Sequence, residues 1–275
     1  MGTYYEWKST IKINIFILKL MGLWPGTNDS RSSRLYTIYT VITIVFFLYG
    51  SVSLQILYVV LIRTNLETLT RLLFVLMTKS LVCVKAFCLM QNTKIIQRLI
   101  KNMNKDLFQV KTINHWNLIQ PALLIWKMTY FTFWLLATST IFMWSISPIL
   151  DKSFKEYQLP FPALYPYDTQ KSPFYEITYV HQVIGVFIVG TTDSNLDTLI
   201  SALMTFVGAQ CDILCDNLRN IDYKKFNEQL KTCMRHHKEI LSFAAESNHF
   251  FNMIVLGQFF ATGVNIAAGM FRLSM

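Results

Sequence analysis

Three stretches of the chain are too long and too apolar for the core of an ordinary soluble domain. They cover residues 35–62, 128–150 and 247–271, and they contain no Asp, Glu, Lys or Arg over 28, 23 and 25 residues. About 20 mostly apolar residues are enough for a helix to cross the hydrocarbon core of a bilayer. Charged residues make up 15% of the chain, against about 25% in an average soluble protein. The sequence therefore predicts an all-α integral membrane protein, a helical bundle.

Two weaker apolar stretches bring the predicted number of membrane spans to five. One covers residues 72–90 and contains Lys79 and Lys85, and the other covers residues 177–210 and contains Asp193 and Asp197. The five predicted spans are residues 35–62, 72–90, 128–150, 177–210 and 250–271. The fourth has 34 residues, about 51 Å as a helix at 1.5 Å per residue, so we expect it to continue into the cytoplasm.

The distribution of Lys and Arg predicts the orientation, because cytoplasmic segments are enriched in positive charge. Residues 1–34, 91–127 and 211–249 contain five, six and six of these residues, whereas residues 63–71 and 151–176 contain two and three. This alternation predicts a cytoplasmic N-terminus, cytoplasmic segments at 91–127 and 211–249, and an extracellular loop at 151–176. Because the positive charge is divided among several loops, a nucleic-acid partner is not expected.

The N-terminal segment, residues 1–34, contains a candidate interfacial helix. Lys8, Lys12 and Lys19 fall on one narrow helical stripe, and apolar residues between Trp7 and Leu20 cover most of the rest. This pattern is typical of a helix that lies in the surface of the lipid bilayer. The alternative is a frayed basic tail.

The cytoplasmic segment 211–249 has the pattern of a helix of its own. Apolar residues recur there at steps of three and four, namely Phe226, Leu230, Cys233, Met234, His237, Ile240, Leu241 and Ala244. An apolar stripe in the cytoplasm must pack against helices of the same chain or against a neighbouring subunit. The sequence leaves both possibilities open.

Charged residues inside the predicted spans are candidates for function, because each costs free energy to insert into a membrane. Asp193 and Asp197 are one helical turn apart in the fourth span. Pairing of Lys85 with Asp197, or of Lys79 with Asp193, is possible. A charge pair that fixes the register of two helices is favoured over a proton or ion relay.

The chain carries no motif of an enzyme, a cofactor site or a metal site. It has no Gly-rich phosphate loop, no His-Glu-x-x-His and no nucleophile elbow. All five cysteines lie in predicted spans or cytoplasmic segments, where thiols stay reduced. Cys211 and Cys215 precede His236 and His237, but the spacing matches no zinc pattern. We expect no enzymatic activity, no metal and no cofactor.

The segment LPFPALYPYDTQKSPFYEITYVHQ, residues 159–182, interrupts the apolar pattern. Its prolines favour extended and turned backbone, and its tyrosines suit the membrane interface or a lid over the helix ends. The segment resembles the outer loop and fourth-helix start of insect odorant receptors, whose pattern runs Leu-Pro-Phe, an aromatic, Pro-aromatic-Asp, then Ser-Pro-x-Tyr-x-x-x-Tyr-x-x-Gln. GLWP at residues 22–25 and TDSNLDTLISALMTFVGAQCDILCDNL at residues 192–218 are similar to that family as well. Leu164 departs from the pattern, since an aromatic often stands there.

The resemblance implies an odorant receptor subunit in the plasma membrane of olfactory sensory neurons. Members of the family have seven spans, bind small volatile ligands, and form a heterotetrameric cation channel with a co-receptor subunit. Ligand binding shifts the population of the channel toward a dilated pore. The seventh helix lines that pore, whereas this chain stops at Met275, after its fifth predicted span. We therefore expect a fragment, a truncated gene model or a splice form that lacks the pore helix.

The resemblance also implies which residues form the site. The family binds its ligand in the outer half of the bundle, beneath the outer loop, and few polar groups in such a pocket suit an apolar volatile. Candidates carried over by depth are Phe74, Met77, Thr78, Thr138, Phe142, Ser145, Tyr179, Gln182, Val183 and Val186. Plain helix packing is the alternative for each of them. Candidates for a lid in the outer loop are Tyr165, Tyr167, Asp168 and Tyr175, and candidates for subunit contact are Leu230, Met234 and Leu241.

Two other classes of chemoreceptor are the alternatives. A G-protein-coupled receptor has an extracellular N-terminus and an acidic-Arg-aromatic triplet at the cytoplasmic end of its third span. Here the third span ends in SISPILD, on the predicted outer side. A gustatory-type channel subunit would lack the Tyr-Pro-Tyr-Asp loop found at residues 165–168.

Overall fold

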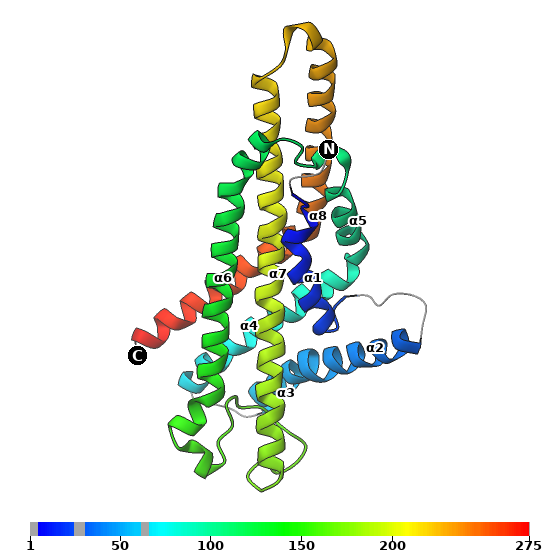
Figure 1. Cartoon of the computed structure of the whole chain (residues 1–275). Coiled ribbons are helices and arrows are strands. Elements are labelled where there is room, and N and C mark those ends of the chain that lie inside the picture. The colour runs from blue at the N-terminus through cyan, green and yellow to red at the C-terminus, as the bar shows by residue number, and fades with distance from the viewer. Residues whose placement is uncertain (1–4, 25–30, 62–65, 275) are drawn as a thin grey trace. The chain divides into compact units, whose positions relative to one another are not determined.

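The computed structural model describes residues 5–24, 31–61 and 66–274, and within these residues all regular secondary structure is helical (Figure 1). The longer helices are α1 (Lys8–Leu20), α2 (Arg31–Ile42), α3 (Gly50–Leu61), α4 (Leu66–Gln91), α5 (Thr93–Met103), α6 (Ile113–Leu150), α7 (Phe174–Arg219) and α8 (Phe226–Ser274). The predicted all-α fold class is confirmed.

Five helical segments of the described chain are long and apolar enough to cross a membrane, which confirms the predicted number. They are Arg34–Leu61, Leu72–Gln91, Ile113–Leu150, Phe174–Arg219 and Tyr223–Phe271. Helices α7 and α8 contain 46 and 49 residues, more than twice the roughly 20 that a bilayer requires. Helix α8 continues without a break through residue 250, where the sequence pattern suggested a boundary between a cytoplasmic helix and the last span.

Helices α2 and α3 form one continuous helix with a π-helical segment, Thr43–Tyr49, between them. The backbone N–H of Gly50 donates to the carbonyl of Val45, five residues earlier. A Cβ at this glycine would lie 2.8 Å from the same carbonyl oxygen. Because Gly50 has no side chain, the backbone can form the π-helical turn, which is wider than an α-helical turn.

The chain divides into two compact units, and the first consists of Met1–Ile17, Gln91–Phe133 and Asn195–Met253. Its core is a cluster of aromatic rings, in which the centroid of Phe206 lies 5.0 Å from Trp7, 5.3 Å from Phe108 and 4.6 Å from Phe243. The carbonyl of Phe108 accepts hydrogen bonds from Trp7 Nε1 at 3.0 Å and from Gln210 Nε2 at 3.1 Å. The polar edges of this apolar core are thus paired, as buried polar groups require.

Helix α1 packs onto α7 in this first unit through a buried polar contact. Asn14 Nδ2 donates to the carbonyl of Asn195 at 3.2 Å and to Thr198 Oγ1 at 2.9 Å, and Asn195 Nδ2 donates back to the carbonyl of Asn14 at 3.0 Å. Lys8 and Lys12 are exposed on the other side of the helix. Helix α1 therefore has a face bound to the protein as well as a basic face.

The second unit consists of Leu18–Met90, Trp134–Ser194 and Ile254–Met275. Within it, residues 134–150 of α6 and residues 174–194 of α7 form a helical hairpin, joined by the long green loop at one end of Figure 1. Large apolar side chains such as Leu136, Phe142 and Phe259 are exposed on its helices. Exposed apolar surface of this extent is typical of lipid-facing helices.

The structure pairs Lys85 with Asp193, an ion pair that was not among the predicted pairings. Lys85 Nζ lies 2.7 Å from Asp193 Oδ1, and the Lys85 side chain is fully buried. The predicted pairing of Lys79 with Asp193 was wrong, because Lys79 contacts the ring of Phe161, whereas the pairing of Lys85 with Asp197 stays a prediction. Asp193 and Asp197 lie one turn apart on the same face, so which lysine each carboxylate reaches depends on the axial offset of α4 and α7, which sequence spacing does not contain.

Candidate functional site

The loop between α6 and α7 is fixed to α7 by one glutamine. The backbone N–H of Phe161 donates to Gln182 Oε1 at 3.0 Å, and Gln182 Nε2 donates to the carbonyl of Phe161 at 2.8 Å. Both residues are buried. The side-chain amide thus satisfies two backbone groups that the proline-rich stretch Leu159–Pro162 leaves outside any helix.

Further hydrogen bonds attach the loop at other points. The N–H of Leu164 donates to the carbonyl of Leu54 at 3.2 Å, which ties the loop to α3. Tyr175 OH donates to the carbonyl of Gln158 at 3.0 Å. The ring of Phe161 stacks on Trp144 of α6, with 5.1 Å between the centroids. The loop is therefore packed against and hydrogen-bonded to the helices of the second unit.

Three of the four predicted lid residues take part in these contacts. Tyr165 OH lies 3.2 Å from His181 Nδ1, and Tyr167 OH lies 2.8 Å from Thr178 Oγ1. Tyr175, whose OH donates to the carbonyl of Gln158, is buried.

The fourth predicted lid residue, Asp168, is exposed and has its contacts within the loop. Its carboxylate accepts from the N–H of Gln170 at 3.0 Å and lies 3.0 Å from Lys171 Nζ. The bond from Gln170 and the contact with Lys171 lower the pKa of the Asp168 carboxyl. Asp168 therefore shapes the loop itself.

An open apolar pocket of about 410 Å³, called the cavity below, lies along α6 and α7 in the second unit, and Phe142 and Phe187 in its wall are exposed. Its lining residues are Thr138, Ile141, Phe142 and Ser145 of α6 with Val183, Ile184 and Phe187 of α7. The hydroxyls of Thr138 and Ser145 donate to carbonyls of their own helix, at 2.7 and 2.8 Å. The wall of the cavity is consequently apolar, although two of its residues are formally polar.

Four of the ten predicted ligand-binding residues line this cavity together: Thr138, Phe142, Ser145 and Val183. Ile141, Ile184 and Phe187 were missed. Ile141 follows Thr138 by three residues, and Phe187 follows Val183 by four, so helical spacing was a signal that pointed to them. Gly190 gives Ile141 room, since a Cβ there would lie 2.6 Å from the Ile141 side chain.

The other six predicted residues are placed elsewhere in the second unit. Gln182 holds Phe161, and Tyr179 OH donates to the carbonyl of Ser145. Thr78 Oγ1 donates to the carbonyl of Phe74 at 3.0 Å and receives a hydrogen bond from Asn265 at 3.3 Å. None of these six, which also include Met77 and Val186, lines the cavity.

A second, much smaller space lies beneath the loop, with a volume of about 10 Å³. It is lined by Ser51, Gln55, Lys79, Ala163, Tyr165, His181, Gln182 and Gly185. Lys79 is 6% exposed, and its Nζ lies 4.5 Å from the ring centroid of Phe161. A buried ammonium therefore faces a water-sized space under the loop.

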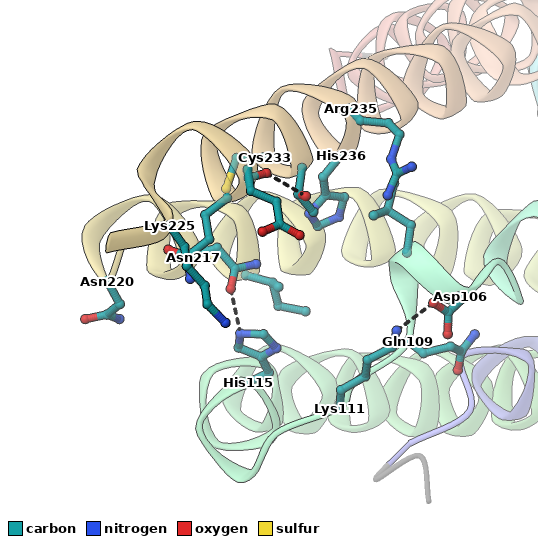
Figure 2. A pocket seen from close by; sticks show the side chains of 15 residues that line it. Asp106, Gln109, Lys111, His115, Asn217, Asn220, Lys225, Cys233, Arg235 and His236 are labelled. Carbon is teal, nitrogen blue, oxygen red and sulfur yellow. Dashed lines mark hydrogen bonds and ion pairs between the residues drawn. The ribbon is translucent and has the colours of Figure 1, made fainter. Parts of the chain in front are cut away.

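A polar pocket of about 520 Å³ lies in the first unit (Figure 2). Some of its charged and polar groups are bonded to one another or to neighbouring residues. Lys111 Nζ lies 2.6 Å from Asp106 Oδ2, and His236 Nε2 donates to Gln210 Oε1 at 3.0 Å. Among the described residues, no group of three His, Cys, Asp or Glu side chains is arranged to hold a metal ion.

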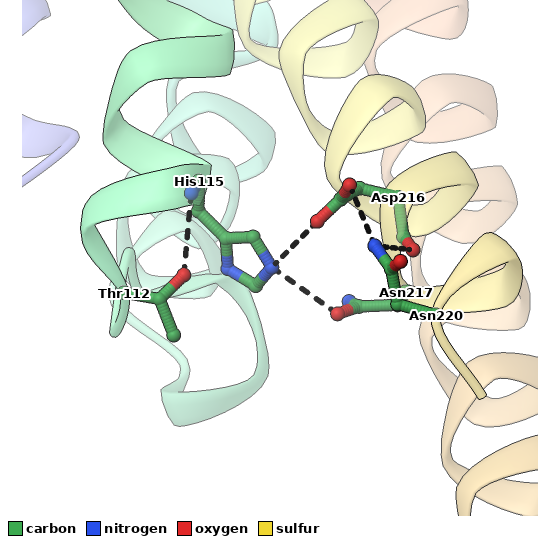
Figure 3. A network of polar contacts seen from close by, with 5 residues as sticks. All are labelled: Thr112, His115, Asp216, Asn217 and Asn220. Atoms are coloured by element: carbon green, nitrogen blue, oxygen red, sulfur yellow. Dashed lines mark hydrogen bonds and ion pairs between the residues drawn. The ribbon is translucent and has the colours of Figure 1, made fainter. Parts of the chain in front are cut away.

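The histidine at one edge of this pocket connects the start of α6 to the end of α7 (Figure 3). His115 Nε2 lies 3.1 Å from Asn217 Oδ1 and 3.7 Å from Asp216 Oδ2. The N–H of His115 donates to Thr112 Oγ1 at 3.2 Å, which caps the N-terminus of α6. Neither Asn217 nor its contact with His115 was predicted from the sequence, whereas Thr112, three residues before His115 at a helix start, was a signal for the cap.

The residues of the apolar stripe 226–244 differ in their exposure. Cys233 and Ile240 are buried within the first unit, whereas Met234 is 66% and Leu241 56% exposed. Leu230 is half-buried. The stripe thus packs partly against its own chain and leaves part of its apolar surface uncovered.

Comparison with known proteins gives a consistent result. A model of the 7tm Odorant receptor family matches residues 65–275. Odorant receptor Or1 of Anopheles gambiae is 25% identical over 295 residues, which cover 95% of this chain and 69% of that receptor. Odorant receptor 13a of Drosophila melanogaster is 25% identical over 290 residues, covering 95% of this chain and 68% of that receptor.

The fold is similar to that of a solved receptor. The insect olfactory receptor OR5 from Machilis hrabei superimposes with a TM-score of 0.77 at 17% identity, over 94% of this chain and 70% of that one. The structure of the same receptor in complex with eugenol gives a TM-score of 0.78 at 16% identity, over 94% and 69%.

Proposed function

We infer the function from one premise: the match over residues 65–275 shows that this chain belongs to the 7tm odorant receptor family. It is a multi-pass membrane protein of that family and not an enzyme. From this membership we propose that it is an odorant receptor subunit of the plasma membrane of olfactory sensory neurons. Its ligand is a small, volatile, hydrophobic molecule, and it gates a cation channel together with a co-receptor subunit.

The observation that carries this proposal is the apolar cavity between α6 and α7. Its volume of about 410 Å³ falls within the roughly 300–1,000 Å³ typical of small-molecule sites. The hydroxyls of Thr138 and Ser145 already donate to backbone carbonyls. A ligand without strong polar groups can therefore bind here without leaving either hydroxyl unpaired. Apolar contact is then the main source of affinity.

The chemical size of the ligand is suggested by the structural relative. OR5 from Machilis hrabei was solved in complex with eugenol, a small aromatic molecule. We propose that the cavity of this chain takes ligands of similar size, with Phe142 and Phe187 as aromatic contacts.

The helical hairpin that lines the cavity is the element through which a ligand acts. Tyr179 of α7 donates to the carbonyl of Ser145 of α6, and the clamp between Gln182 and Phe161 holds the loop at the same end. A ligand that fits only one arrangement of α6 and α7 raises the population of that arrangement. We propose that this shift is passed to the channel.

Binding of volatile probes to the purified chain in lipid nanodiscs tests the proposal. The probes are eugenol and a panel of small aromatic and terpenoid volatiles, with affinity measured by calorimetry. Val183→Trp fills the cavity and is expected to abolish binding, and Phe142→Ala is expected to weaken it about tenfold through lost apolar contact. Phe259→Ala, which removes an exposed Phe of α8, is the matched control and leaves the affinity unchanged.

Two results would contradict the proposal. One is that the wild-type chain binds no volatile of the panel. The other is that Val183→Trp binds these volatiles as well as the wild type does, which would place the ligand elsewhere.

A further inference from the structure

Lys79 is a charged residue buried in the middle of a membrane-spanning helix. It lies in α4, within the span Leu72–Gln91, and is 6% exposed. Among the described residues its ammonium makes no ion pair and no hydrogen bond. It lies over the face of the Phe161 ring, in a cation–π contact. A cation–π contact replaces only part of the hydration that a buried ammonium has lost.

The contrast with Lys85, six residues later in the same helix, is informative. Lys85 is also buried, and its Nζ lies 2.7 Å from the carboxylate of Asp193. Asp193 therefore compensates Lys85 and not Lys79. Of the two buried lysines in this span, one has an acid from the protein and the other faces a cavity.

A second buried polar side chain faces the same cavity without a partner. Gln55 of α3 is 3% exposed, and its Oε1 has no hydrogen bond within the described chain. It lines the space of about 10 Å³ together with Lys79 and Tyr165. An amide can present either its oxygen or its NH₂ group to a ligand by rotating.

We propose that Lys79 is the anchor for an acidic ligand, in which the Lys79 ammonium binds the carboxylate of a small organic acid and the amide of Gln55 makes a second contact to it. In surroundings of low dielectric constant, an ammonium is stabilised far more by an anion than by a neutral dipole. A hydrogen bond between an ammonium and a carboxylate is also among the strongest that side chains make. The ligand supplies the negative charge that Asp193 supplies to Lys85.

The space beside Lys79 is too small to hold an organic acid without a rearrangement. About 10 Å³ accommodates roughly one water molecule, so a carboxylate with its alkyl chain must displace the ring of Phe161 from the ammonium. Phe161 belongs to the loop that Gln182 holds, and its ring stacks on Trp144. Binding of the acid therefore moves the loop, whereas a ligand in the cavity between α6 and α7 leaves the ring of Phe161 in place.

This inference rests on the proposed odorant receptor function and names a class of ligand for it. The test uses two isomeric probes, hexanoic acid and methyl pentanoate, which share one formula but of which only the acid is ionised at pH 7. Binding of each, and of eugenol, is measured by calorimetry with the full chain in nanodiscs. The wild type is expected to bind the acid about 10- to 100-fold more tightly than the ester.

Two variants of Lys79 and a control separate charge from structure. Lys79→Met is expected to lower the affinity for the acid to that for the ester, and to leave the affinity for the ester unchanged. Lys79→Arg keeps the charge and retains a preference for the acid. Lys155→Met removes an exposed lysine of the loop and changes neither affinity.

Equal binding of acid and ester by the wild type overturns this inference, and so does a preference for the acid that survives in Lys79→Met. If eugenol still binds in either case, the proposed function stands without it. If neither eugenol nor either isomer binds, both proposals fail. A loss of eugenol binding in Lys79→Met would show that Lys79 holds the fold together and does not select an acid.

Discussion

At the residue scale, the side chain of Gln182 satisfies backbone hydrogen-bonding groups, as the backbone of a helix does elsewhere in the chain. Its amide donates to the carbonyl of Phe161 and accepts from the N–H of the same residue. The loop around Phe161 contains prolines at 160, 162 and 166, which rule out a regular helix. The backbone groups of Phe161 are buried, so they need a partner from another element.

Gln182→Leu is expected to release the loop, because it leaves two buried backbone groups unpaired at a cost of about 1–3 kcal/mol each. The variant should unfold at a lower temperature and should be cleaved faster by protease within residues 151–173. Gln170→Leu, at an exposed position of the same loop, is the matched control and should behave as the wild type does. A Gln182→Leu protein with wild-type stability and wild-type cleavage would show that the clamp is not needed.

Lys79 and Lys85 show how far residue-level prediction from the sequence extends. Both were identified as candidates from composition, because a charge in an apolar run is visible without any structure. The pairing of Lys85 with Asp193, and the position of Lys79 under the ring of Phe161, were not predictable. They depend on where the loop and α7 lie against α4.

At the scale of a secondary-structure element, α8 has two apolar faces with different environments. Ile240 and Phe243 are buried within the first unit, whereas Met234 and Leu241 are exposed. Met234 and Leu241 are seven residues apart and so lie on one face of the helix. We propose that this part of α8 lies in the cytoplasm, where such a surface is suited to contact with another subunit.

The double variant Met234→Asp/Leu241→Asp is expected to abolish co-purification with a tagged co-receptor subunit. Both side chains are exposed in the single chain, so the charges should disturb a subunit interface and leave insertion and stability unchanged. Ser242→Asp, at an exposed polar position about 100° around the same helix from Leu241, is the control for charge. Undiminished co-purification of the double variant would rule out this face as the contact.

The apolar cavity brings together only part of the residues that were predicted to bind a ligand. Four predicted residues of α6 and α7 meet at the cavity because both helices carry small and aromatic side chains at matching helical spacing. The predicted residues of α4, such as Phe74 and Thr78, lie elsewhere. Thr78 contacts Asn265 of α8 instead, and the rotation of α4 about its own axis, which decides this, is set by packing with several helices at once.

At the scale of the whole molecule, the proposed orientation places the N-terminus and the connection between α7 and α8 in the cytoplasm. It places the loop between α6 and α7 outside the cell. Both statements come from the distribution of Lys and Arg along the sequence. They can be tested with glycosylation acceptor sites, which are modified only on the lumenal or extracellular side.

D151N creates an acceptor motif that ends at Ser153 in the loop between α6 and α7, and we expect it to be glycosylated. Asp222→Ser creates one that begins at Asn220, between α7 and α8, and we expect it to stay unmodified. Serine can still cap the turn at residue 222, where the Asp222 side chain accepts from the N–H of Lys224. A mass increase sensitive to glycosidase in Asp222→Ser, without one in D151N, would reverse the orientation.

The sequence by itself determined the helical class, the five spans and the family resemblance, which the comparisons confirmed. These properties follow from hydrophobicity, charge and motif spacing, each of which is local along the chain. Only the tertiary structure decided that Asp193 pairs with Lys85, that Gln182 clamps Phe161, and that α1 is held by Asn195. The physical reason is that such contacts depend on the offset and rotation of whole helices, which side chains distant in sequence set together when they pack.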